Sequence, residues 1–276
     1  MKTIVFLVFL LLSAFRARAA DTDACLDQVV RVGLYDLSFA MMRSESGQAS
    51  GAAVDVLKEL GSRTGCRVTF FYAPQARIKS MFLQDQLDII PATRNPEYDA
   101  KGIFIQQFSA QPVVLSLDPH YKHAQPDLIF TSSLRFLAVR GSDSARAIID
   151  HSKARGYDIQ VEYSPTPELA VKKLLARRGD FLIGSTLLYY RALRQQMPDI
   201  HVEVIKIDTA PIAAGYYINR SLQTKVGYVR VYSTLLAMQA DGTMAALSKD
   251  YLPPSVAQAV EVDAPAPSKK RHRSKR

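Results

Sequence analysis

The chain has 276 residues and a formal net charge of +9, with two cysteines and five histidines. Its excess of positive charge lies at the two ends, because residues 1–19 and 268–276 carry nine Lys and Arg and no acidic residue. Residues 20–267 are therefore formally neutral. A nucleic-acid-binding domain carries a basic face, so this balance argues against that class and we expect no nucleic-acid partner.

Residues 1–19 have the organisation of a secretory signal peptide. Lys2 precedes an apolar run over residues 4–12, and an Ala-x-Ala cleavage site ends at Ala19. The run is shorter than the roughly 18 apolar residues that a bilayer span requires. We therefore expect an exported protein located in the periplasm, whose mature chain begins near residue 20.

The first half of the mature chain alternates predicted strands and helices. The hydrophobic patterns predict strands over 29–34, 67–72 and 87–90, with helices over 51–60 and 78–83 between them. Gly61 is interpreted as the stop of the first helix. This β-α-β-α-β order predicts a parallel sheet with helical crossovers. Residues 113–117 are interpreted as an extended segment that crosses to a second lobe.

Cys25 and Cys66 each precede one of the first two predicted strands. If these strands are parallel neighbours, the two cysteines lie at the same end of the sheet, within reach of a disulfide. An oxidising compartment permits the bond. We expect a Cys25–Cys66 disulfide, with two free thiols as the alternative.

Residues 86–98 join a buried strand to a capped helix. Asn95 is a suitable N-cap, Pro96 suits the first helical position, and Glu97 lies in the first turn, where negative charge is favoured. A helix N-terminus at the carboxyl end of a strand is a common ligand site in α/β proteins. This predicts the mouth of a ligand site, with an ordinary strand–helix loop as the alternative.

The second half repeats the alternation and then returns to the first lobe. We predict strands over 134–139, 159–163, 180–183 and 200–207, a second crossing over 210–217, and a long amphipathic helix over 222–240. Two α/β lobes joined by two crossings form a clamshell with a binding cleft. The predicted lobes and tail are residues 20–114 with 212–255, residues 115–211, and a disordered basic tail over 256–276. The tail either contacts an anionic envelope surface or only adds solubility.

Several stretches, in this order, resemble the family 3 extracellular solute-binding proteins, which have the type II periplasmic-binding fold. The stretches are Arg31–Tyr35, Gly51–Val56, Leu87–Glu97, Gly179–Asp180 and Leu236–Thr243. The resemblance covers residues 29–252. It implies a receptor that captures a small solute and hands it to a membrane ABC permease. Related members are sensor modules, and a few are periplasmic dehydratases.

The sequence departs from the amino-acid-binding members at two charged positions. In those members, an arginine in the turn after the third strand binds the α-carboxylate, and an aspartate of lobe 2 binds the ammonium group. Thr93 matches the threonine of that turn, but Tyr98 occupies the arginine position and Ser185 the aspartate position. A hydroxyl does not replace a charge-assisted, bidentate contact. We therefore expect a small polar or anionic ligand that is not a standard amino acid. Arg94 either substitutes for the missing arginine or points to solvent.

Four further residues are candidate ligand contacts, the first three by the same resemblance and Ser142 by its place at a helix start. Tyr35 and Phe39 follow the first strand, where stacking side chains lie, and core packing is the alternative. Arg77 matches an arginine that suits an anionic group, with a structural ion pair as the alternative. Ser142 opens a lobe 2 helix whose free N–H groups suit a ligand oxygen, unless Asp143 caps that helix itself.

Enzymatic motifs are absent from the sequence. It contains no Gly-rich phosphate loop, no His-x-x-x-His pair and no Gly-x-Ser-x-Gly elbow. His120 and His123 share a loop without a third metal ligand. We therefore predict a monomeric, non-enzymatic receptor without cofactor or metal. The alternatives are a dehydratase on the same fold, which would need an acid and a base such as Asp143 and Glu97, and a ligand-sensing partner of a membrane receptor.

Overall fold

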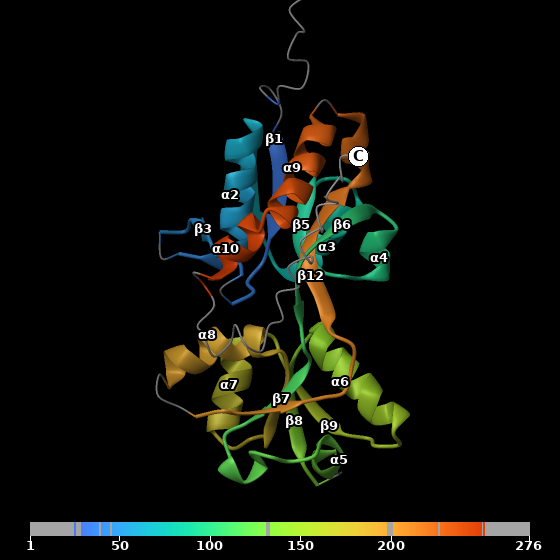
Figure 1. Ribbon diagram of the computed structural model, residues 1–276. Coiled ribbons are helices and arrows are strands. Elements are labelled where there is room, and N and C mark those ends of the chain that lie inside the picture. The colour runs from blue at the N-terminus through green and yellow to red at the C-terminus, as the bar shows by residue number, and fades with distance from the viewer. Residues whose placement is uncertain are drawn as a thin grey trace, which may run out of the picture.

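The computed structural model describes residues 25, 29–38, 40–44, 46–130, 133–197, 201–225, 227–249 and 251. The predicted signal peptide and basic tail lie outside these residues. The described chain forms two α/β lobes, each built on a five-stranded sheet and stacked one above the other (Figure 1). Within this part of the chain, no helix is long and apolar enough to cross a membrane.

The sheet of lobe 1 is mixed rather than parallel. In spatial order its strands are β4 (Arg67–Tyr72), β1 (Val29–Leu34), β5 (Ile89–Thr93), β12 (Ile212–Asn219) and β6 (Gly102–Ala110). The three strands predicted from the sequence pair in parallel, but β12 is antiparallel to both β5 and β6. The prediction that residues 210–217 are a crossing segment is therefore wrong, because most of them belong to β12.

The helices of lobe 1 cover the two faces of this sheet. They are α2 (Ala52–Thr64), α3 (Gln75–Leu83), the short α4 (Pro96–Asp99), α9 (Tyr228–Ala240) and α10 (Thr243–Lys249). Helix α2 continues through Gly61 and ends at Gly65, which has a φ of 72°. A Cβ on Gly61 would lie 3.0 Å from the Val68 side chain, so this glycine permits close packing against β4 instead of stopping the helix. A two-stranded hairpin, β2 (Met42–Arg43) and β3 (Ala49–Ser50), projects beside them.

Lobe 2 has a similar arrangement. Its strands are, in spatial order, β11 (Glu203–Lys206), β7 (Val113–Ser116), β10 (Phe181–Gly184), β8 (Arg135–Val139) and β9 (Gln160–Ser164). The segment that was predicted as the first crossing is thus strand β7, and the predicted lobe boundary after residue 114 falls inside it. Helices α5 (Pro126–Ile129), α6 (Asp143–Ala154), α7 (Pro167–Leu175) and α8 (Thr186–Gln196) pack around the sheet.

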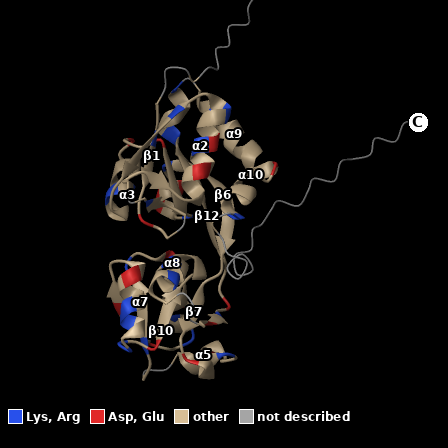
Figure 2. Ribbon diagram, turned by 90° about the vertical axis from the view of Figure 1, so that its left-hand side faces the viewer, with Lys and Arg blue, Asp and Glu red and all other residues tan. Residues whose placement is uncertain are grey.

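Each lobe has its own hydrophobic core. Val32, Leu57 and Ile89 are fully buried in lobe 1, and Phe136 and Leu182 are fully buried on opposite faces of the lobe 2 sheet. Two short connections, residues 111–112 and 207–211, join the sheets along one side of the molecule (Figure 2). Lobes with separate cores and short connections are suited to hinge motion.

The predicted disulfide is confirmed. Strands β1 and β4 are parallel neighbours, with Val29 opposite Arg67, so the preceding cysteines lie at the same end of the sheet. Cys25 and Cys66 are bonded, and their Cα atoms are 4.8 Å apart.

Candidate functional site

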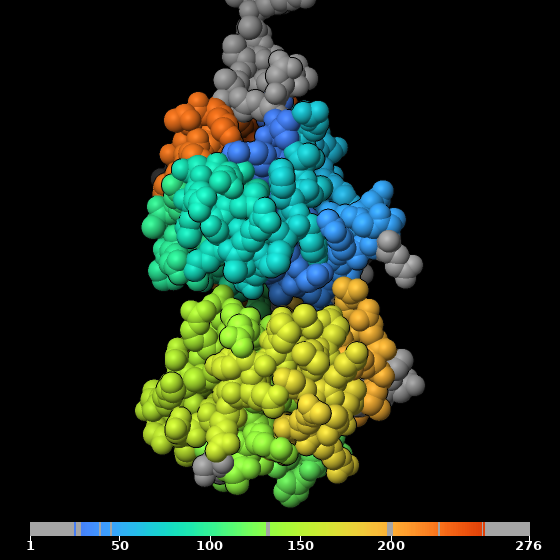
Figure 3. Space-filling model, turned by 180° about the vertical axis from the view of Figure 1, so that it is seen from behind, coloured from blue at the N-terminus to red at the C-terminus, as the bar shows by residue number. Residues whose placement is uncertain are grey.

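The carboxyl ends of the parallel strands of both lobes face one another, and a side-chain hydrogen bond joins them. Strand β5 ends at Thr93, and strand β8 leads into helix α6, whose first residue is Asp143. The Thr93 hydroxyl donates to the Asp143 carboxylate across the boundary between the lobes. In the space-filling view, a groove marks this boundary (Figure 3). A junction of strand carboxyl ends is where α/β proteins bind ligands.

The turn after β5 is held rigidly. The Asn95 side chain accepts a hydrogen bond from the Glu97 N–H at 3.0 Å, which confirms the predicted helix cap. The Tyr217 hydroxyl accepts from the Asn95 N–H and donates to Asp99, both at 2.9 Å. Strand β12 therefore anchors the turn that carries Thr93. Sequence reasoning missed Tyr217, because its segment was interpreted as a crossing.

Tyr98 belongs to the core of lobe 1. It is 6% exposed, and its ring lies 5.7 Å from that of Phe82 and 5.2 Å from that of Tyr217, measured between centroids. Burial raises the pKa of Tyr98 to about 12, and the charges of Asp143 and Glu97 add to this effect. Tyr98 therefore lies within electrostatic reach of Asp143 in the other lobe.

Tyr35 lies in the same surroundings. It is 5% exposed, and burial raises its pKa well above the ordinary value, with smaller contributions from Tyr98 and Asp143. Within the described residues, neither the Tyr35 nor the Tyr98 hydroxyl forms a hydrogen bond. The structure thus brings Tyr35, Thr93 and Tyr98 of lobe 1 together with Asp143 of lobe 2. Phe39 lies outside the described residues.

Ser142 and Ser185 are both helix caps. The Ser142 hydroxyl accepts from the Ala145 N–H at 3.2 Å, and the Ser185 hydroxyl accepts from the Leu188 N–H at 3.3 Å. Ser142, and not Asp143, is therefore the side-chain cap of α6. Each cap uses a lone pair of the serine oxygen, so the hydroxyl hydrogen is still able to donate.

The two candidate arginines occupy different surroundings. The Arg94 side chain is 63% exposed and lies over the Phe104 ring, 5.9 Å from its centroid, beside Asp99. Arg77 is also exposed, and its guanidinium group forms no hydrogen bond or ion pair within the described chain. Its helical turn borders lobe 2, since a Cβ on Gly141 would lie 3.9 Å from the Gln75 side-chain oxygen.

A second contact between the lobes lies near helix α8. Leu37 packs against the cores of both lobes. The Tyr72 hydroxyl donates to Asp36 at 2.5 Å. Burial raises the pKa of Tyr72 and this hydrogen bond adds to the effect, whereas the positive charge of Arg191 in α8 opposes it. These residues were not predicted, although Tyr72 ends β4 and Leu37 lies shortly after the end of β1.

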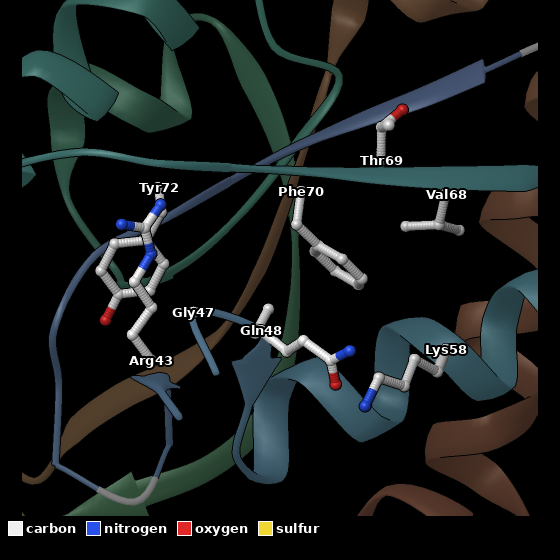
Figure 4. Close-up of a pocket in the computed structure, with 9 residues that line it drawn as sticks. Arg43, Gly47, Gln48, Lys58, Val68, Thr69, Phe70 and Tyr72 are labelled. Atoms are coloured by element: carbon white, nitrogen blue, oxygen red, sulfur yellow. The ribbon is translucent and has the colours of Figure 1, made fainter. Parts of the chain in front are cut away.

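A separate depression of about 400 Å³ lies on lobe 1 (Figure 4). It is bounded by β4, helix α2 and the β2–β3 hairpin. Its lining includes Arg43, Gln48, Lys58, Phe70 and Tyr72. The Arg43 guanidinium carbon lies 5.1 Å from the centre of the Tyr72 ring. Only lobe 1 lines this depression, whereas both lobes contribute to the junction at Thr93 and Asp143, so we take the junction as the candidate site.

The described residues contain no group of three His, Cys, Asp or Glu that could hold a metal ion.

The sequence profile of the bacterial extracellular solute-binding proteins, family 3, matches residues 30–254. The chain therefore belongs to this family, whose members are extracellular. No curated protein sequence matches the chain.

Solved structures share the fold at low sequence identity. A putative L-cystine ABC transporter protein from Listeria monocytogenes is 17% identical, with a TM-score of 0.67 over 83% of this chain and 98% of that chain. A histidine-bound substrate-binding protein of an ABC uptake transporter from Streptococcus pneumoniae is 14% identical, with a TM-score of 0.67 over 84% and 96% of the two chains. A histidine kinase sensor domain is 14% identical, with a TM-score of 0.65 over 82% and 97%. These proteins establish the two-lobed periplasmic-binding fold of this chain.

Proposed function

We propose that the protein is a periplasmic receptor that binds a small polar solute, other than a standard amino acid, between its lobes. In this proposal, the closed form is then recognised by a membrane ABC permease. Contacts from both lobes stabilise the closed form and shift the population toward it. The observation that carries the proposal is the hydrogen bond between Thr93 and Asp143, because it joins the strand ends of both lobes at one point.

Two features support the exclusion of ordinary amino acids. Tyr98 and Ser185 stand where the amino-acid-binding relatives have an arginine and an aspartate, and in this chain the first packs in a core and the second caps a helix. Asp143 also adds a negative charge beside Thr93, which would repel an α-carboxylate placed in that turn.

Native mass spectrometry of freshly purified protein tests the proposal directly, and we expect a retained small molecule that is not an amino acid. Thermal unfolding with individual solutes provides a second measurement, since a solute that binds only the native state raises its stability. The largest shift with a standard amino acid would contradict the proposed ligand class. Chemical conversion of a bound solute would favour the dehydratase alternative.

A further inference from the structure

The carboxylate of Asp143 is a negative charge placed at the meeting point of the lobes. One oxygen accepts from the Thr93 hydroxyl, and the other pairs with Arg146 at 2.9 Å. The Arg146 side chain is 60% exposed, whereas that of Asp143 is 21% exposed. An ion pair with such an exposed partner is weakened by water and salt. Among the described residues, no buried cation is paired with Asp143.

The surroundings of Asp143 on the lobe 1 side are aromatic and hydroxylic. Tyr35 and Tyr98 are both more than nine-tenths buried, and their hydroxyls have no hydrogen-bond partner in the described chain. The charge of Asp143 contributes to the raised pKa of each, after burial. Two tyrosine hydroxyls without a protein partner, carried by buried rings beside a carboxylate, form a set of polar groups that a solute could hydrogen-bond.

A solute that enters between the lobes replaces the Thr93 hydroxyl as a partner of Asp143. A carboxylate at this point would meet a like charge. A neutral group would leave the aspartate charge shielded from water without a counter-charge. A protonated nitrogen would donate charge-assisted hydrogen bonds to Asp143 and would lie favourably against tyrosine rings.

We propose that Asp143 selects solutes bearing a protonated amine or guanidinium group, which binds among Asp143, Thr93, Tyr35 and Tyr98. This inference rests on the proposed receptor function and narrows its ligand class. The sequence allowed an anionic ligand. At the end of the cleft near Asp143 we instead expect the ligand to carry a cationic group.

Matched pairs of small molecules test this selectivity. The amines are 1,4-diaminobutane, 1,5-diaminopentane and tyramine. Their counterparts, in which a carboxylate replaces each aminomethyl group, are succinate, glutarate and 4-hydroxyphenylacetate, none of which carries a cationic group. Isothermal titration calorimetry on the wild-type protein should give tighter binding for at least one amine than for its counterpart, by about tenfold or more, as expected for a hydrogen bond to a charged group.

Variants of Asp143 test whether the preference for amines over carboxylates depends on the charge of this residue. Asp143→Asn keeps an acceptor for Thr93 but removes the charge, and should weaken amine binding by about 10- to 100-fold. Asp143→Glu keeps the charge and should retain the preference for the amine. Asp150→Asn, on the exposed face of the same helix, is the matched control and should bind as the wild type does. Circular dichroism spectra and Tm values should be measured to verify that each variant is folded.

Three results would overturn the inference. They are tighter binding of the carboxylates, equal amine binding by Asp143→Asn and Asp150→Asn, and no binding of any of the amines at millimolar concentration. A retained acidic or neutral solute in native mass spectrometry would also overturn it, while leaving the receptor function in place. Absence of a retained solute, combined with no thermal shift for any class of solute, would instead contradict the receptor function.

Discussion

The side-chain amide of Gln111 donates to the Ile207 carbonyl at 2.8 Å, and so ties together the two connections between the lobes. The same amide donates to the Thr209 carbonyl at 3.0 Å. A backbone hydrogen bond from the Ile207 N–H to the Pro112 carbonyl, at 3.4 Å, also joins the two connections. The Gln111 side chain therefore strengthens a link between the lobes that the backbone also makes.

Removal of this amide should loosen the hinge. We expect Gln111→Ala to lower the free energy of unfolding by about 1–2 kcal/mol, since two carbonyls lose a donor. Small-angle scattering should show a larger radius of gyration. Gln84→Ala, which removes an exposed amide bonded to Ser80, is the control and should change neither quantity. An unaltered radius of gyration in Gln111→Ala would show that the hinge is held by the backbone alone.

Asp88 should be among the most important charges for stability. It is fully buried and accepts hydrogen bonds from Arg31 and Lys225, each with a shortest distance of 2.8 Å. Because Asp88 is buried and its truncation removes hydrogen bonds to two charged side chains that are themselves partly exposed, Asp88→Ala should cost about 2–3 kcal/mol in urea unfolding. The control is Asp127→Ala at an exposed pair with Arg155, where the expected cost is at most about 1 kcal/mol. Similar costs for the two variants would contradict this assignment.

The stability that Asp88 supplies should depend on pH. Burial by itself would raise the pKa of Asp88, but the hydrogen bonds from Arg31 and Lys225 outweigh burial and hold it below its usual value. A folded-state pKa below the unfolded value of about 3.9 gives a contribution that is complete at neutral pH and is lost as the pH falls below about 4. The difference in unfolding free energy between wild type and Asp88→Asn should therefore shrink on acidification. A difference that stays constant from about pH 7 to about pH 3 would contradict a lowered pKa for Asp88 in the folded state.

Loss of the disulfide should destabilise lobe 1. The bond closes a loop with a sequence separation of 41 residues. By the chain-entropy relation, a loop of this size contributes about 4 kcal/mol. We expect the Cys25→Ser, Cys66→Ser double variant to unfold at lower urea concentration, and dithiothreitol to have the same effect on the wild type but none on the variant. Equal midpoints for reduced and oxidised wild type would refute the prediction.

Gly215 should tolerate no side chain. A Cβ at this position would lie 2.0 Å from the Ile105 carbonyl oxygen, where β12 has an irregular register with β6. Gly215→Ala must push the two strands apart next to the hinge, so we expect a loss of more than about 2 kcal/mol or failure to fold. Gly156→Ala is the comparison, because Gly156 has a φ of 84° but open space around it. It should cost only about 1–2 kcal/mol from backbone strain. The Tm values of the two variants provide the measurement.

Local sequence signals predicted those elements whose determinants are close together in the chain. The Asn95–Pro96–Glu97 run predicted the cap and start of α4, and both are confirmed. The order of the first three strands predicted the parallel pairing that brings Cys25 to Cys66. The predicted stop at Gly61 failed, because a glycine inside a helix also serves close packing against a neighbouring strand, and only the position of Val68 distinguishes the two roles.

The largest errors concerned β7 and β12. Both are short extended runs that leave one lobe for the other, and an extended segment has the same local pattern whether it crosses between sheets or pairs within one. Their strand partners lie far away in sequence, as Leu115 with Leu182 and Tyr216 with Pro91 show. The role of Tyr217 in the turn after β5 was missed for the same reason.

The sequence by itself determined the family, the two-lobed architecture and the disulfide, because each depends on residue identity and order along the chain. By resemblance it also predicts Tyr98 and Ser185 at the positions of the charged pair used for amino acids. Only the tertiary structure decided that Ser142 caps α6, which leaves Asp143 facing Thr93 across the boundary between the lobes. The physical reason is that hydrogen bonding and charge at a cleft depend on distances between segments about 50 residues apart, set by the packing of two separate lobes and not by either segment alone.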